Sequence, residues 1–381
     1  MTTHKDLKRR VRERAARTGE SYTTARRHVV AAAGPSGYPF GAGAHRESTL
    51  LGHLLQHAGH RDPRTGEPYT EAMLCGLAGG IGFLYAVFEY RGLPPMVTIV
   101  AQHHPEPWAP AALRRLGIAH TVAHSSSPRA ATAALDAALA AGAAVQCTVG
   151  RAALPWHRES GALDADPYPV VVAGRRDDGL VVDDGAGRPH VIGAEPFAQA
   201  WAAHRKGRFQ RLTIGGPDGE PDLAAAVRDA VATTVAHLTG PVLGNSFDVN
   251  MGFSGMARFA AQLRDTRGRT GWARRMAAPG ALDRALRRVH DCLEREYTAP
   301  GGTRPLYADF LDEAATVLSE PRLRAAAALF RASGALWSAV AVGRDPVAMA
   351  DRVDTARETE EAAVRILAAV VEEGGPAPTS P

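Results

Sequence analysis

A glycine-rich lead into an apolar helical run, near residue 45, constrains this chain more than any other feature. Gly41 and Gly43 precede the polar group His45-Arg46-Glu47-Ser48, and the leucines of LLGHLL follow after Thr49. Because these leucines recur at helical spacing, the pattern predicts a loop that delivers polar residues to a helix N-terminus. Such an end carries unpaired N–H groups and a positive partial charge, which favours an activated nucleophile or a bound anion.

A second stretch, from Glu71 to Glu89, is predicted to be helical although four glycines interrupt it. A glycine inside a helix costs roughly 1 kcal/mol relative to alanine. The glycines are therefore expected where another backbone or a ligand approaches closely. Gly76, Gly79 and Gly80 are candidate substrate-binding positions on this basis.

Length and composition indicate an ordinary globular chain with room for two cores. It has 381 residues, 45% of them hydrophobic and 22% charged. No apolar run approaches the roughly 18 to 20 residues that span a bilayer, and the charged N-terminus shows no secretory signal. The three cysteines, Cys75, Cys147 and Cys292, lie far apart. They predict reduced thiols in a cytoplasmic protein, without a disulfide framework or a zinc site.

The order of elements predicts an α+β fold followed by an all-α domain. We expect a basic helical arm over 1–33, an α+β domain over 34–216, a helical domain over 221–373 and a disordered tail over 374–381. Expected strands in the second region lie at 96–101, 120–123, 145–149, 170–173, 180–183 and 209–214. Expected helices in the third lie at 224–239, 252–263, 282–296, 307–318, 322–342 and 346–373.

The basic charge of the chain is concentrated at its N-terminus. Residues 1–28 hold nine Lys or Arg and three Asp or Glu, a balance of +6, against +4 for the whole chain. This arm is interpreted either as a solvated appendage or as a module for nucleic acid, an anionic membrane surface or an acidic partner. No base-reading motif accompanies the charge.

The run from His45 to Tyr85 resembles the N-terminal domain of butirosin biosynthesis protein H. The resemblance rests on His45, Glu47, Ser48, the run Thr70-Glu71-Ala72-Met73 and the segment Gly76 to Tyr85. It implies a fold related to papain-like cysteine peptidases, and transfer of acyl groups from carrier-protein thioesters to amines. Arg46 occupies the position of the family's cysteine, which excludes thiol catalysis at that position.

The later parts of the chain extend this resemblance. The family's histidine opens the strand written here as PVVVAG, so its position falls on Tyr168 or Pro169. Its orienting carboxylate falls on Asp183 or Asp184, and Asp184 is taken as the catalytic candidate. Residues 301–314, GGTRPLYADFLDEA, followed by Trp337, resemble the helical domain that accompanies the butirosin-type domain in bacterial proteins.

Ser48 is the candidate nucleophile that could replace the missing cysteine, with His45 as its base. The alternative is that Ser48 caps the helix and His45 has a structural role. Cys75 is a second candidate nucleophile, although its apolar context MLCGL is typical of a buried, inert thiol. Arg46 is interpreted either as an anion-binding residue beside Glu47 or as a solvated or ion-paired side chain.

Histidine-rich segments raise the question of a metal. His53 and His57 have i,i+4 spacing, and His103-His104-Pro105-Glu106 adds further donors. Because no HExxH run is present and no third ligand is indicated, no metal and no cofactor are predicted.

Three functions are consistent with these observations. The first is acyl or aminoacyl transfer from a carrier-protein thioester in bacterial specialised metabolism, with a changed nucleophile. The second is a pseudoenzyme that binds a carrier protein, a peptide or a small molecule. The third is a nucleic-acid or anionic-surface binder that acts through residues 1–28.

Overall fold

The computed structural model describes residues 37–92, 94–157, 167–217, 219 and 221–373, together with Arg12, Ser21 and Tyr22. The predictions for the basic arm and the C-terminal tail fall outside these residues. The chain forms two compact units that are not consecutive in sequence. Unit 1 contains residues 1–43, 49–68 and 120–217, and unit 2 contains residues 44–48, 69–119 and 218–381.

Unit 1 is built on a six-stranded antiparallel sheet with the strand order β3-β8-β4-β5-β6-β7. Its strands are β3 (His120–Ala123), β4 (Val145–Gly150), β5 (Pro167–Arg176), β6 (Gly179–Asp183), β7 (His190–Ile192) and β8 (Arg211–Ile214). Its helices include α6 (Pro128–Ala140) and α7 (Ala194–Ala203), with short 3-10 turns at Arg151–Ala153 and Arg205–Gly207.

The core of unit 1 follows from alternation along the strands. Val145, Cys147 and Val149 of β4 point to the same face because successive side chains alternate across a sheet. The apolar faces of α6 and α7 pack on this face, with Leu135 from α6 and Trp201 from α7. Ser127 caps α6, since its side chain accepts the N–H of Ala130.

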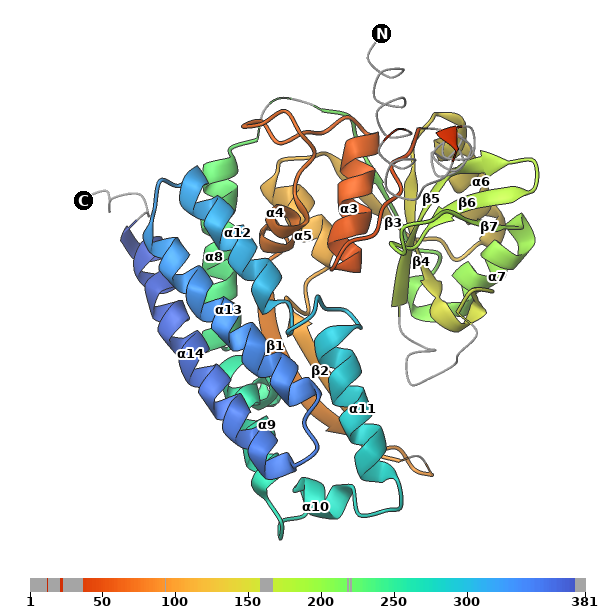
Figure 1. The fold of residues 1–381 in the computed structure, drawn as a ribbon. Coiled ribbons are helices and arrows are strands. Elements are labelled where there is room, and N and C mark those ends of the chain that lie inside the picture. Colours follow the sequence, from red (N-terminus) through yellow and green to blue (C-terminus); the bar gives the residue numbers. More distant parts are fainter. Residues whose placement is uncertain are drawn as a thin grey trace. The chain divides into compact units, whose positions relative to one another are not determined.

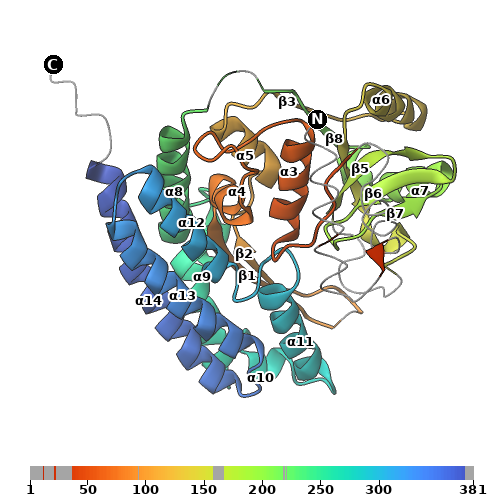
Figure 2. The same ribbon diagram turned by 45° about the horizontal axis from the view of Figure 1, so that its top comes forward.

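Unit 2 combines a two-stranded antiparallel sheet with a helical bundle (Figures 1 and 2). The strands are β1 (Ile81–Phe88) and β2 (Met96–Gln102). The helices are α4 (Glu71–Leu77), α5 (Trp108–Arg115), α8 (Leu223–Thr239), α9 (Gly252–Arg264), α10 (Trp272–Arg275), α11 (Ala281–Glu294), α12 (Arg304–Val317), α13 (Arg322–Ala341) and α14 (Pro346–Glu373), with a 3-10 turn at Ser246–Asn250. Helix α13 packs against both α12 and α14, and α9 and α8 pack against β1.

Helix α3 (Arg46–His57) contains a border between the units, which falls after Ser48. Its first three residues belong to unit 2 and the rest to unit 1. Its leucines, such as Leu51 and Leu54, are buried as their helical spacing predicts. The mixed fold, with a sheet in the N-terminal half and helices in the C-terminal half, agrees with the expected sequence of elements.

The predicted helix from Glu71 to Glu89 is wrong in its second half. The helix α4 ends at Leu77, and Ile81–Phe88 form the strand β1. Gly79 and Gly80 have φ values of +110° and +66°. These values lie outside the right-handed helical region, so the helix ends here, and glycine adopts them more readily than other residues do. The run IGFLYAVF is apolar throughout and mostly buried, so its periodicity does not distinguish a strand from a buried helix.

Candidate functional site

The loop that leads into α3 is held by a carboxylate from α4. Glu71 accepts the backbone N–H of Ala44 at 3.0 Å and that of His45 at 2.5 Å. Thr70 caps α4 by accepting the N–H of Met73 at 2.9 Å, which fixes the place of Glu71 in the first turn. The run Thr70-Glu71-Ala72-Met73 therefore positions the residues that open α3.

Four side chains of unit 2 form a continuous chain of hydrogen bonds at this helix start. Ser48 Oγ lies 2.7 Å from His45 Nδ1, and His45 Nε2 lies 2.6 Å from Gln102 Oε1. The amide Nε2 of Gln102 donates to Glu47 Oε2 at 3.3 Å. The backbone N–H of Ser48 also donates to His45 Nδ1, at 3.3 Å. The loop thus folds back as contact between His45 and Ser48 requires.

The carboxylate of Glu47 determines which atom donates and which accepts in each of these hydrogen bonds. An ionised carboxylate only accepts hydrogen bonds, so Gln102 presents its NH₂ group to Glu47 and its oxygen to His45. His45 must then carry its proton on Nε2, which leaves Nδ1 as an acceptor for the hydroxyl of Ser48. This is the tautomer in which a histidine can take a proton from a serine.

Burial keeps His45 neutral. His45 and Ser48 are each 1% exposed. Desolvation lowers the pKa of His45 below its ordinary value, and the nearby charge of Glu47 opposes this shift only in part. The ring of Trp108 lies 5.1 Å from the His45 ring, centroid to centroid. The imidazole is therefore available as a base at neutral pH, and it is shielded from water. Arg46, the first residue of α3, is half-buried.

Protein side chains fill the space beside the three candidate glycines. An added Cβ would lie 2.1 Å from the ring of Phe310 at Gly76, and 2.5 Å from the ring of His103 at Gly79. At Gly80 it would lie 2.4 Å from the ring of Tyr307. The close approach expected from the sequence is thus made by aromatic and imidazole rings of unit 2.

Cys75 is buried within α4 and 0% exposed. Burial raises the pKa of its thiol far above the ordinary value, and the charge of Glu71 adds to this rise. Burial likewise raises the pKa of Cys147 and Cys292. The thiolate form of Cys75, which nucleophilic attack requires, is therefore strongly disfavoured.

Unit 1 holds the remaining candidates, Tyr168 and Asp184. Asp184 is 2% exposed and lies beside two histidines that the sequence did not indicate. Its Oδ2 is 3.6 Å from His157 Nε2, and its Oδ1 is 3.3 Å from His190 Nε2. Although burial alone would raise it, the pKa of Asp184 is lowered by His157 and His190 and by the N–H of Ala186.

Aromatic rings surround this cluster. The ring of His157 packs edge-on against Tyr168 at 4.9 Å, and that of His190 stacks on Trp156 at 4.1 Å. Tyr168 is therefore next to a histidine that faces Asp184. The neighbouring Asp183 has other partners, since it accepts from Tyr38 and pairs with His53 at 2.7 Å.

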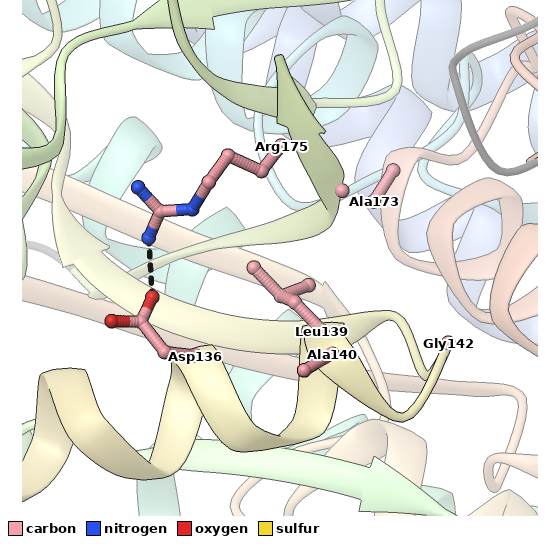
Figure 3. A pocket seen from close by; sticks show the side chains of 7 residues that line it. Asp136, Leu139, Ala140, Gly142, Ala173 and Arg175 are labelled. Carbon is pink, nitrogen blue, oxygen red and sulfur yellow. Dashed lines mark hydrogen bonds and ion pairs between the residues drawn. The ribbon is translucent and has the colours of Figure 1, made fainter. Parts of the chain in front are cut away.

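A separate pocket of about 320 Å³ lies in unit 1 between the C-terminal part of α6 and the end of β5 (Figure 3). Asp136 and Arg175 form an ion pair at its side, and Leu139, Ala140 and Ala173 contribute apolar surface. None of the candidate site residues lines it.

Two of the histidines that raised the question of a metal, His53 and His57, have separate partners, and so does His60 nearby. His53 pairs with Asp183, His57 contacts the carbonyl of Gly142, and His60 contacts that of Gly215. Within the described part of the chain, no three His, Cys, Asp or Glu side chains are grouped so that they could hold a metal ion. No helix among these residues is long and apolar enough to cross a membrane.

Sequence reasoning missed Gln102, His157 and His190. Gln102 reaches His45 across 57 positions of sequence, so no spacing pattern could reveal it. His190 belongs to a three-residue strand, β7, that was not predicted. The only available signal was the presence of these polar residues at strand and turn ends.

The fold and the site together define a mixed α/β protein in which a buried Ser–His pair opens a helix. Residues 45–184 match the family described as butirosin biosynthesis protein H, N-terminal. Residues 197–373 match a domain of unknown function (DUF4872). The chain thus carries a butirosin biosynthesis protein H N-terminal domain followed by a DUF4872 domain, as its sequence motifs predicted. No curated protein matches it significantly.

Proposed function

We propose that the protein is an acyltransferase of papain-like ancestry that acts on a thioester in bacterial specialised metabolism. The observation that carries this proposal is the hydrogen-bond chain Glu47–Gln102–His45–Ser48 at the start of α3. The family match adds a biosynthetic context, because the family's name refers to a biosynthetic protein, and the resemblance described above implies the acyl-transfer reaction class. The papain-like assignment is supported by the order of three features along the chain, which is the order that the resemblance implies. These are the start of α3, the strand β5 with Tyr168, and Asp184 at the end of β6.

The proposed reaction proceeds through an acyl-serine. The Oγ of Ser48 attacks the thioester carbon while its proton moves to Nδ1 of His45. The C–S bond breaks, and the leaving thiolate takes the proton from His45. An amine then attacks the ester carbon and gives a proton to His45; the C–O bond breaks, an amide forms, and Ser48 takes that proton from His45. The positive end of α3 favours the negative charge that develops near Ser48.

Intact-protein mass spectrometry after incubation with acyl-pantetheine thioesters tests this reaction. We expect an adduct of one acyl group per chain that is absent from Ser48→Ala and reduced in His45→Gln. Cys75→Ala is the matched control and should retain the adduct, because the Cys75 thiol is buried and protonated. An adduct that survives in Ser48→Ala and disappears in Cys75→Ala would refute the role of Ser48.

A second candidate function is binding without turnover. The 1% exposure of both Ser48 and His45 favours it, since the acyl carbon must reach an almost inaccessible oxygen. The uncharged Gln102 also stabilises a protonated His45 less than a carboxylate in direct contact would. Saturable thioester binding without any adduct would support this function over acyl transfer.

A further inference from the structure

Arg304, the first residue of α12, is fully buried and uses all five of its N–H donors. Its Nε and Nη2 donate to the two carboxylate oxygens of Glu360, at 2.8 and 3.0 Å. Its Nη1 donates to the carbonyls of Ala101 and Gly302, both at 2.8 Å. Its Nη2 also donates to the carbonyl of Gly82 at 3.1 Å.

Two of these carbonyls, those of Gly82 and Ala101, lie within an irregularity in the β1–β2 ladder. Ile81 pairs with Gln102 and Leu84 pairs with Val100, so two residues of β1 lie opposite one residue of β2. Such a bulge disrupts the ladder locally. Since Gly82 and Ala101 lie within it, the guanidinium supplies donors to buried carbonyls on both strands. This contact accounts for an arginine at a position where charge is otherwise costly.

Gln102 follows Ala101 directly and ends β2. Its side chain receives the Nε2–H of His45 and donates to Glu47. The backbone that carries this amide is therefore fixed on one side by the contact of Arg304 with Ala101. Moving that strand end would move the amide that sets the proton of His45.

We propose that Arg304, held by Glu360, is a positioning residue for the Ser48–His45 pair. It fixes the end of β2, and Gln102 at this end keeps His45 in the Nε2–H tautomer. The inference rests on the proposed function for its effect on activity, whereas the tautomer is measurable without a substrate. It also gives the domain of unknown function a role, since residues 304 and 360 belong to it and complete a network in residues 45–102.

The test is ¹⁵N NMR of the His45 ring in the full chain, assigned with a His45→Gln variant. We expect the wild-type ring to be protonated on Nε2 only at neutral pH. Arg304→Lys retains the charge but cannot make five planar donations. We therefore expect it to show a mixture of both tautomers, and Glu360→Gln, which loosens the guanidinium, to show the same change. Where acyl transfer is present, kcat should fall about tenfold with little change in KM, which corresponds to about 1.4 kcal/mol.

Arg331→Ala is the matched control, because Arg331 of α13 makes exposed ion pairs with Asp309 and Asp312 of α12, the helix that carries Arg304. It should leave the His45 signals unchanged. Folded Arg304→Lys and Glu360→Gln variants with a single Nε2–H tautomer would overturn the proposal. Unfolding of both variants would assign the pair to stability alone and would equally overturn it. A wild-type protein without acyl transfer would refute the proposed function and leave the tautomer result valid.

Discussion

Replacing Glu360 by alanine should destabilise unit 2 more than any surface substitution. Glu360 is 0% exposed, and its Oε1 accepts from Ser333 at 2.6 Å and from Trp337 at 2.8 Å besides Arg304. Removal of one partner from a buried ion pair costs about 3 to 5 kcal/mol. A buried donor left unsatisfied costs about 1 to 3 kcal/mol, and these contributions overlap. We therefore expect a loss of about 4 kcal/mol or more in the free energy of unfolding.

The assay is urea unfolding followed by far-UV circular dichroism, which reports on the helices of unit 2. Glu358→Ala is the matched control, because Glu358 is exposed on the same helix and glutamate and alanine both favour helices. It should change stability by less than about 0.5 kcal/mol. A loss of less than about 1 kcal/mol for Glu360→Ala, relative to this control, would refute the view that Glu360 is an obligatory partner of Arg304.

Three further predictions concern the same unit. Gly80→Ala should lower the free energy of unfolding by more than about 2 kcal/mol, because the φ of Gly80 is +66° and a Cβ there would meet Tyr307. The control Gly92→Ala, with a φ of +80° and open space around the added Cβ, should lower it by only about 1 kcal/mol. Thermal unfolding of both variants measures the difference. Glu71→Gln should lose about 1 to 3 kcal/mol and shift the amide NMR signals of the loop before α3. Burial lowers the pKa of His103 from 6.5 to about 3. The contribution of His103 to the free energy of unfolding is therefore complete above pH 6.5 and declines as the pH falls towards 3, by at most about 1.4 kcal/mol per pH unit. Urea unfolding at several pH values should show a flatter slope for a His103→Gln variant.

The sequence predicted most elements because their periodicity and caps are local. The serines before Pro128 capped α6, and the helical spacing in 346–373 gave α14 with its buried stripe. The segment 78–89 was the main error. Its conformation depends on two left-handed glycines and on pairing with β2, and neither is visible in a window of sequence. Tertiary pairing, rather than propensity, determines a short apolar run of this kind.

The site was predictable only where its residues are neighbours in the chain. His45 and Ser48 share a helix start, so their contact follows from the fold of one loop. Gln102 contacts His45 from 57 positions away in the sequence. Arg304 contacts Ala101, the residue before Gln102, from 203 positions away. The motif GGTRPL is visible in the sequence. The carbonyls of Ala101 and Gly82, which accept hydrogen bonds from its arginine, can be identified only from the fold.

In the proposed reaction Ser48 is a nucleophile at a new position on α3, two residues after Arg46. Arg46 and Ser48 are two residues apart on α3, and each residue advances a helix by about 100°. Their side chains therefore leave the helix axis in nearly opposite directions. His45 Nδ1 contacts Ser48, and the substrate would have to meet the helix on that side. If Arg46 holds the position of the family's cysteine, as the sequence resemblance implies, the proposed acyl transfer requires the thioester to approach the opposite face of the helix start, where Ser48 lies.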